Sequence, residues 1–211
     1  MDVLLAPLPP DFLMHLAAGI VLNFWIAFLV LTLGILVGAP LAYGCAMPGR
    51  WHVGPRAIVE LLAAAPTFLV MFFLLTVVPR DFNVFGAQIR ISATAEVVLS
   101  LLPYSIAYVA QNGSEALTQW RRGAYGAALL LLPNLARAFI VLVMASAAGA
   151  AIGVTEGITV IRQAADHLHT LPERLRVFAI GICVFAVLAQ GGFALVTMLR
   201  KRLTARLAKA S

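Results

Sequence analysis

Charged residues are scarce in this chain of 211 residues: Asp, Glu, Lys and Arg make up 11% of it, whereas hydrophobic residues make up 62%. A soluble domain needs about a quarter charged residues to cover its surface, so the composition excludes that class. The mean hydropathy of +0.97 agrees with this exclusion. The sequence therefore predicts an integral membrane protein.

Cysteine is equally rare. Cys45 and Cys183 are the two in the sequence, and both lie within apolar runs, where a free cysteine behaves as a small hydrophobic residue. We expect neither a disulfide nor a metal site. His167 and His169 are two positions apart, which points them to different faces of a helix, and no cluster of carboxylates accompanies them. We interpret them as an exposed pair in an outer loop.

The motifs of common enzyme classes are absent as well. The sequence has no zinc-protease HExxH, no GxSxG nucleophile elbow, no Walker phosphate loop and no dinucleotide-binding fingerprint. Paired carboxylates within the apolar runs are lacking too, and Glu96 is the one acidic residue that we expect inside a span. We predict no catalytic residue and no cofactor, so the chain is not expected to be an enzyme.

The sequence does contain a series of long apolar runs. A helix needs about 20 apolar residues to cross about 30 Å of hydrocarbon, and five segments approach or exceed that length. We predict an all-α integral membrane protein, a single transmembrane domain over residues 1–211, with about five transmembrane helices near 16–46, 58–79, 92–114, 133–155 and 177–199. We expect a short loop over 115–132 and an outer loop over 156–176.

The first apolar run is too long for one upright helix. Its start, PPDFLMHLAAG, is expected to lie along the outer interface until the chain turns into the membrane near Gly19, and Pro40 is expected to bend the far end. A cleaved signal peptide is the alternative for this region. We consider it the weaker interpretation, because Asp2 and Asp11 are acidic and no basic segment precedes the apolar run.

The distribution of basic residues predicts the orientation. If the C-terminus lies in the cytoplasm, nine of the fifteen Lys and Arg residues are on that side: Arg50, Arg56, Arg121, Arg122, Arg200, Lys201, Arg202, Arg206 and Lys209. The positive-inside rule then predicts an N-out, C-in chain. The net charge of +6 reflects this topology and contact with anionic lipid, so a nucleic-acid partner is not needed to explain it.

Glycines recur at the spacing used for helix packing in membranes. Gly34 and Gly38 form one GxxxG pattern, and Gly149 and Gly153 form another in an alanine-rich stretch. Such faces let helices approach closely. We favour packing within the chain over a subunit interface, and the second stretch also suits the wall of a pathway. Pro66, Pro103 and Pro133 interrupt the runs, as in the broken helices of transporters.

Two early segments carry a family resemblance. Residues 16–44 and 59–79 resemble the first spans of a known permease family. In the first segment, Asn23 stands near the family's usual Thr. In the second, Pro66 is kept, while Ala63, Ala64 and Ala65 replace Arg-Gly-Thr. That family is the transmembrane permease subunit of polar amino-acid type ABC importers, the inner-membrane component of binding-protein-dependent transport systems.

Two later segments extend the resemblance to most of the chain. In residues 107–128, Gln111 stands where the family usually has Glu, and residues 123–128 are similar to its GQxEAA, with Gly126 in place of the Glu. In residues 140–157, residues 144–148 replace its KDTSL, whereas Glu156 keeps the ending. The family's coupling helix should follow Ala128, but LLLLPNLAR begins almost at once, so the coupling segment is largely deleted. A helix that transmits ATPase motion needs polar faces, which LLLL lacks.

The resemblance implies a permease subunit of the bacterial inner membrane that moves a small polar solute, such as an amino acid or a related compound. It implies a second, more complete permease, a cytoplasmic ATPase and a solute-binding protein as partners, with membrane lipid around them. It implies these candidates for contact with the ATPase: Gln111, Asn112, Glu115, Arg121, Arg122, Gly123, Tyr125, Gly126, Ala127 and Ala128. The candidates for the pathway or the substrate are Arg137, Met144, Ser146 and Gly149.

Several alternatives stay open. Arg137 either snorkels to the headgroups or pairs with a substrate carboxylate. The whole chain is either a permease or a non-transporting pseudo-permease with a structural or regulatory role, which the alanine-replaced motifs favour. A secondary transporter that works without ATP is a further alternative, although no inverted repeat is visible in the sequence.

Overall fold

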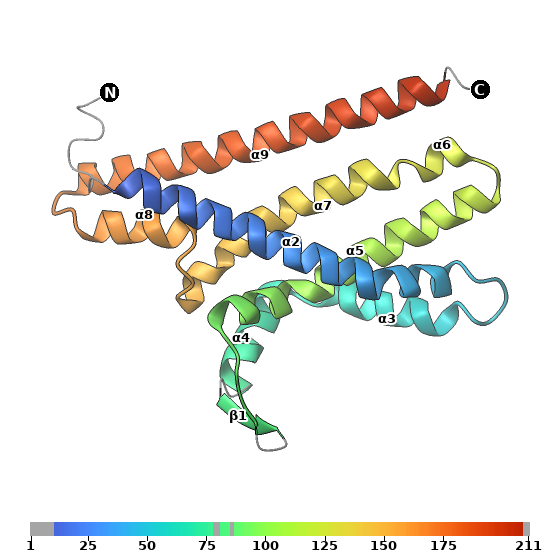
Figure 1. The fold of residues 1–211 in the computed structure, drawn as a ribbon, viewed down its shortest axis with the longest axis horizontal. Coiled ribbons are helices and arrows are strands. Elements are labelled where there is room, and N and C mark those ends of the chain that lie inside the picture. Colours follow the sequence, from blue (N-terminus) through green and yellow to red (C-terminus); the bar gives the residue numbers. More distant parts are fainter. Residues whose placement is uncertain (1–10, 78–80, 85–86, 209–211) are drawn as a thin grey trace.

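The computed structural model describes residues 11–77, 81–84 and 87–208. The chain forms an elongated bundle of long helices from which one short arm projects (Figure 1). The elements follow one another as α2 (Phe12–Cys45), α3 (Val53–Ala64), α4 (Thr67–Val77), β1 (Asp81–Val84), β2 (Ala87–Arg90), α5 (Ala93–Arg121), α6 (Tyr125–Ala128), α7 (Leu131–Ala145), the 3₁₀ helix η1 (Ser146–Ile152), α8 (Gly157–Asp166) and α9 (Leu171–Ala208).

The predicted all-α membrane fold is confirmed. Among the described residues, four helical stretches are long and apolar enough to cross a membrane: Phe12–Cys45, Ala93–Arg121, Tyr125–Ile152 and Leu171–Arg206. A fifth is present if α3 and α4 together count as one broken span. No strand was predicted, yet β1 and β2 pair as an antiparallel hairpin between α4 and α5 in the projecting arm.

The core is formed where α2, α5 and α7 meet. Its buried residues are Ile26, Ala27, Val30, Val97, Val98, Leu101, Leu142, Val143 and Val154. Close approach of α2 and α5 depends on glycine: a Cβ on Gly34 would overlap the Ser105 side chain, and one on Gly38 would lie 2.8 Å from the Ile106 carbonyl oxygen. The Gly34–Gly38 pattern therefore serves packing within the chain, as the sequence analysis favoured.

The start of α2 differs from the expectation. Of PPDFLMHLAAG, the two prolines lie outside the described residues, and the segment from Phe12 onward is the first part of one continuous helix that does not turn at Gly19. The reason is α8, which folds back and buries Phe12 and Leu16 against its own apolar face. Gly19 permits this contact, because a Cβ there would lie 2.7 Å from the Gly157 nitrogen. A helix of 34 residues is about 51 Å long.

The second apolar run is broken at Pro66. In the run expected as a span over 58–79, α3 and α4 meet at an angle of 82°. Proline cannot donate the hydrogen bond that would continue α3, and the preceding Ala65 is extended with ψ of 114°. The helix α3 packs on α5 through Val59, whereas α4 leads into the arm (Figure 1).

The fourth apolar run changes its helix type along its length. After α7, the small residues of η1 wind as a 3₁₀ helix that ends at Gly153 with φ of +86°, a left-handed conformation that favours glycine. The expected outer loop over 156–176 then contains α8. This helix is amphipathic: Val160, Ile161 and Ala164 are buried, while Arg162 and Gln163 are exposed. Residues 156–176 therefore comprise a packed helix, a short turn and the first residues of α9.

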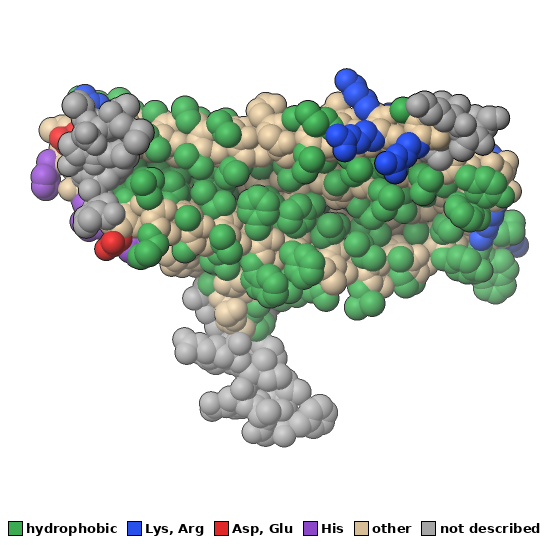
Figure 2. Space-filling model, turned by 45° about the horizontal axis from the view of Figure 1, so that its top comes forward, with side chains coloured by type: hydrophobic (Ala, Val, Ile, Leu, Met, Phe, Trp, Pro, Cys, Tyr) green, Lys and Arg blue, Asp and Glu red, His purple; other side chains and the backbone are tan. Residues whose placement is uncertain are grey.

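Charge separates along the bundle. Figure 2 shows hydrophobic side chains over most of its length, with most visible Lys and Arg side chains toward the end where α9 finishes and the visible acidic and His side chains at the opposite end. We call the first the C-terminal end; it also contains the end of α5 and the short α6 (Figure 1). The end where α2 begins and α8 lies is the N-terminal end.

Candidate functional site

A buried polar cluster lies at the N-terminal end, where α2, η1 and α8 meet. Its members are Asn23, Ser146, Glu156 and Thr159, all fully or almost fully buried. The Asn23 amide Nδ2 donates to Ser146 Oγ at 2.8 Å and to Glu156 Oε2 at 3.2 Å. Its Oδ1 accepts the backbone N–H of Gly157 at 3.2 Å. The Asn23 amide of α2 is therefore hydrogen-bonded to η1 and to the start of α8. We call Asn23, Ser146, Glu156 and Thr159 the Asn23 cluster.

Glu156 is the N-cap of α8. Its carboxylate accepts the backbone N–H groups of Ile158 and Thr159, each at 2.9 Å, and the Thr159 hydroxyl at 3.3 Å. A negative group is stabilised at a helix N-terminus by the unpaired N–H groups and the helix dipole. With the Asn23 amide added, this buried carboxylate is extensively hydrogen-bonded, which is what burial of a charge requires. Glu96, expected inside a span, is also buried; Glu156 is buried although it lies between two of the candidate spans.

A second set of polar side chains lies on α5, α7 and α9 in the half of the bundle near the C-terminal end. The Tyr108 hydroxyl donates to the Asn134 carbonyl oxygen at 3.2 Å, and Asn134 Nδ2 donates to Asn112 Oδ1 at 2.8 Å. Asn112 in turn donates to the Tyr108 carbonyl oxygen at 2.9 Å. The first two of these bonds join α5 to α7, whereas the third lies within α5.

Two small polar pockets adjoin this set. One, of about 240 Å³, includes Asn112, Glu115 and Gln119 in its wall, and the other, of about 230 Å³, includes Arg137, while both share Asn134 and Arg200. We call Tyr108, Asn112, Glu115, Asn134, Arg137 and Arg200 the polar strip.

Arg137 is exposed, and its guanidinium lies over the Phe193 ring of α9, 6.0 Å from the ring centroid. Within the described part of the chain, neither Arg137 nor Arg200 forms an ion pair. The wall of the pocket that they share has two arginines and no acidic side chain, which suits a carboxylate or a phosphate.

The loop candidates divide between two elements. Gln111, Asn112, Glu115 and Arg121 belong to α5, which continues past the expected end of its span to Arg121. Gly123, with φ of +78°, ends this helix, and Tyr125, Gly126, Ala127 and Ala128 form the single turn of α6. Arg121 donates to the Ala46 carbonyl oxygen and so fastens the end of α5 to the end of α2. Arg122 is exposed beside it.

The pathway candidates are not brought together. Ser146 is completely buried in the Asn23 cluster, and Gly149 is buried against Val97 and Val154, whereas Met144 is exposed. Arg137 lies in the polar strip, away from η1. A pathway role for each of these four residues stays a prediction.

Asn23, Glu156 and Asn134 were not among the predicted site residues, although the first two lie within segments that resemble the family. An asparagine in a 34-residue apolar run was the available signal, since polar residues within a span need partners. The described residues contain no group of three or more His, Cys, Asp or Glu side chains that could hold a metal. His167 bonds its own helix through the Gln163 carbonyl oxygen at 2.7 Å, and both cysteines are free.

Similar proteins were found by comparison with solved structures and not by comparison of sequences. No family model matches the sequence, and no curated protein sequence matches it. An amino acid ABC transporter crystallised with histidines has a TM-score of 0.67 and 20% identity over 91% of this chain and 95% of that chain. The MetNI methionine ABC transporter in an inward-facing conformation has a TM-score of 0.62 and 16% identity over 90% and 98%. The chain therefore has the fold of the membrane subunits of ABC transporters.

Proposed function

We propose that this chain is a permease subunit of an ABC importer and that it moves a small polar solute, an amino acid or a related compound, into the cytoplasm. One observation carries the proposal: the similarity covers 91% of this chain and 95% of a chain from an amino acid ABC transporter. A match from end to end indicates the whole architecture of a permease rather than one shared helical hairpin. ATP hydrolysis would belong to a separate subunit.

The proposed assembly contains this chain, a cytoplasmic ATPase, a solute-binding protein and a second permease with a complete coupling helix. The second permease is proposed because α6 is a single turn of four residues. One turn presents too little surface to transmit the motion of an ATPase. The proposed location is the bacterial inner membrane. The N-terminus is proposed to lie outside, because the basic residues gather at the C-terminal end.

The polar strip is the proposed route of the solute through the half near the C-terminal end. Its amides and hydroxyls offer hydrogen bonds in a span that is otherwise apolar. Arg137 supplies a fixed positive charge, and a guanidinium matches the geometry of a carboxylate. An amino acid carries the required carboxylate. Gln111 and residues 121–128 remain the proposed surface toward the ATPase, whereas Asn112 and Glu115, first assigned to that surface, are proposed here for the route of the solute.

The test begins with the tagged chain purified from its native membranes. We expect an ATPase with a Walker motif and a second permease to be retained, and we expect the reconstituted complex to take up amino acids when ATP is enclosed with the ATPase. Uptake by this chain alone, driven by an ion gradient without ATP, would instead indicate a secondary transporter.

A non-transporting pseudo-permease is the second candidate. The observation that favours it is the short α6, together with Ala63, Ala64 and Ala65 at the break before Pro66. The two candidates differ in one result. Both outcomes concern a complex assembled without this chain. Uptake of solute at the full rate would mean that the chain has no transport role. Loss of uptake by the assembled complex would support the permease role.

A further inference from the structure

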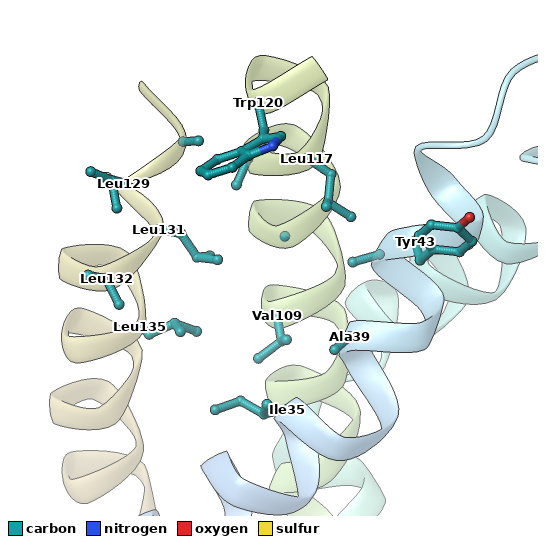
Figure 3. A pocket seen from close by; sticks show the side chains of 14 residues that line it. Ile35, Ala39, Tyr43, Val109, Leu117, Trp120, Leu129, Leu131, Leu132 and Leu135 are labelled. Atoms are coloured by element: carbon teal, nitrogen blue, oxygen red, sulfur yellow. The ribbon is translucent and has the colours of Figure 1, made fainter. Parts of the chain in front are cut away.

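An apolar pocket of about 550 Å³ opens between α2, α5 and α7 near the C-terminal end. Figure 3 shows its wall: Ile35 and Ala39 from α2, Val109 and Leu117 from α5, and a row of leucines around the start of α7. None of the fourteen residues around it carries a charged or amide side chain. Such a wall offers a polar solute no hydrogen-bonding partners beyond the edges of Tyr43 and Trp120. No residue of the polar strip belongs to this wall, so the two sites are distinct.

The depth of the pocket matches one leaflet of a membrane. On α2 the wall extends from Tyr43 to Ile35, which is about 12 Å along a helix axis. Half of the hydrocarbon thickness is about 15 Å. Trp120 and Tyr43 lie at one end of the pocket (Figure 3), and such aromatic residues mark the level of the headgroups.

The pocket has positive charge at the same end. The Arg121 guanidinium lies 5.8 Å from the centroid of the Tyr43 ring, which forms part of the wall. Its one described hydrogen bond goes to the Ala46 carbonyl oxygen, and a guanidinium has five N–H donors. Within the described residues, Arg121 forms no ion pair. Donors are therefore left for an anion at the level of the headgroups.

We propose that this pocket binds an acyl chain of an anionic phospholipid whose phosphate pairs with Arg121. The chain occupies the apolar wall down to Ile35, and the phosphate lies beside Arg121 and the exposed Arg122. A zwitterionic lipid such as phosphatidylcholine has the same phosphate, but its ammonium group offsets that charge, so its net attraction to the two arginines is weaker. A free phosphate would lack the apolar contact. The proposal does not depend on the transport role of the chain.

The test uses Trp120 as the reporter, because its indole is part of the wall. The full chain carrying Trp25→Phe and Trp51→Phe keeps Trp120 as its single tryptophan and is reconstituted into bilayers. Phosphatidylglycerol with brominated acyl chains, diluted into phosphatidylcholine, should quench Trp120 as if enriched about fivefold over its bulk fraction. Brominated phosphatidylcholine in phosphatidylglycerol should quench no more than its bulk fraction predicts.

Matched variants separate the two parts of the site. Ala39→Phe fills the pocket and should remove the enrichment, whereas Val37→Phe adds the same ring to α2 at an exposed position outside the wall. Arg121→Gln should make the two headgroups equivalent, whereas Arg206→Gln, at the far end of α9, should not.

Two results would overturn the proposal, and both come from the reporter chain without either site variant. Equal quenching by the two lipids would mean ordinary boundary lipid. Absence of quenching in both bilayers would mean that protein covers the pocket.

Discussion

The buried carboxylate of Glu156 accepts hydrogen bonds from α2 and from the first turn of α8. Truncation by Glu156→Ala leaves two N–H groups of α8 without their acceptor and removes one of the two acceptors of the Asn23 amide. We expect a loss of about 1–3 kcal/mol in the free energy of unfolding, measured as a lower thermal midpoint in detergent, with Glu156→Gln in between. The control is Glu60→Ala, because the exposed pair of Glu60 with Arg56 contributes about 0–1 kcal/mol. Equal midpoints for Glu156→Ala and Glu60→Ala would contradict this role.

Arg137 is the residue on which the proposed carboxylate interaction depends. Hydrogen bonds to charged groups contribute about 1.5–3 kcal/mol, so Arg137→Ala should raise the KM for uptake by about 10- to 100-fold. Arg137→Lys keeps the charge and should have a smaller effect. The measurement is concentration-dependent uptake by the reconstituted complex.

Arg162 provides the comparison for Arg137, since it is exposed on α8 at the opposite end of the bundle. Arg162→Ala should leave KM unchanged. Unchanged uptake and unchanged affinity in Arg137→Ala would show that this arginine only snorkels to the headgroups.

At the scale of elements, the contact between α2 and α5 is the tightest feature of the core. Gly34→Leu would place a side chain where Ser105 already lies. Because overpacking typically costs about 1–3 kcal/mol, we expect a lower thermal midpoint and partial misfolding. Gly54→Leu is the matched control, as no atom lies within 4 Å of a Cβ at that position of α3. Similar midpoints for both variants would mean that α2 and α5 are not in contact at Gly34.

The elements also show what the sequence allows one to predict. Apolar runs locate the long helices, because length and hydropathy decide membrane insertion locally. The end of α5 at Arg121 was missed by seven residues, since a helix can continue beyond the hydrocarbon with polar side chains on its surface. The angle of 82° at Pro66 depends on what α3 and α4 pack against, which no local pattern reveals.

The candidate site was less predictable than the fold for the same reason. The residues of the Asn23 cluster are separated by 123 and 133 positions in the sequence. Their contact exists only because α8 folds back over the start of α2, and an outer loop was expected there. Arg137 was identified from its charge within a span and Arg121 through the family resemblance, but their neighbours Phe193 and Tyr43 follow from the packing of helices.

For the whole molecule, the segregation of charge predicts which end faces the cytoplasm. The test uses a chain in which Cys45→Ala and Cys183→Ala remove the native cysteines. In this chain, Arg122→Cys should react with a membrane-impermeant maleimide only in inverted vesicles. Arg162→Cys should react only in intact cells. Both positions are exposed, so access alone does not separate them. The reverse labelling pattern would place the C-terminus outside and would remove the proposed ATPase surface from the cytoplasm.

The Asn23 cluster also has a consequence for biogenesis. Asn23 enters the membrane when Ser146 and Glu156 have not yet been synthesised, and 133 residues separate it from the carboxylate. At about 5–20 residues per second, translation needs on the order of ten seconds to supply that partner. During this interval an amide in the first span has to be accommodated by water, by the insertion machinery or by a temporary neighbour. The first helix therefore reaches its final bonding state only after most of the chain has been made.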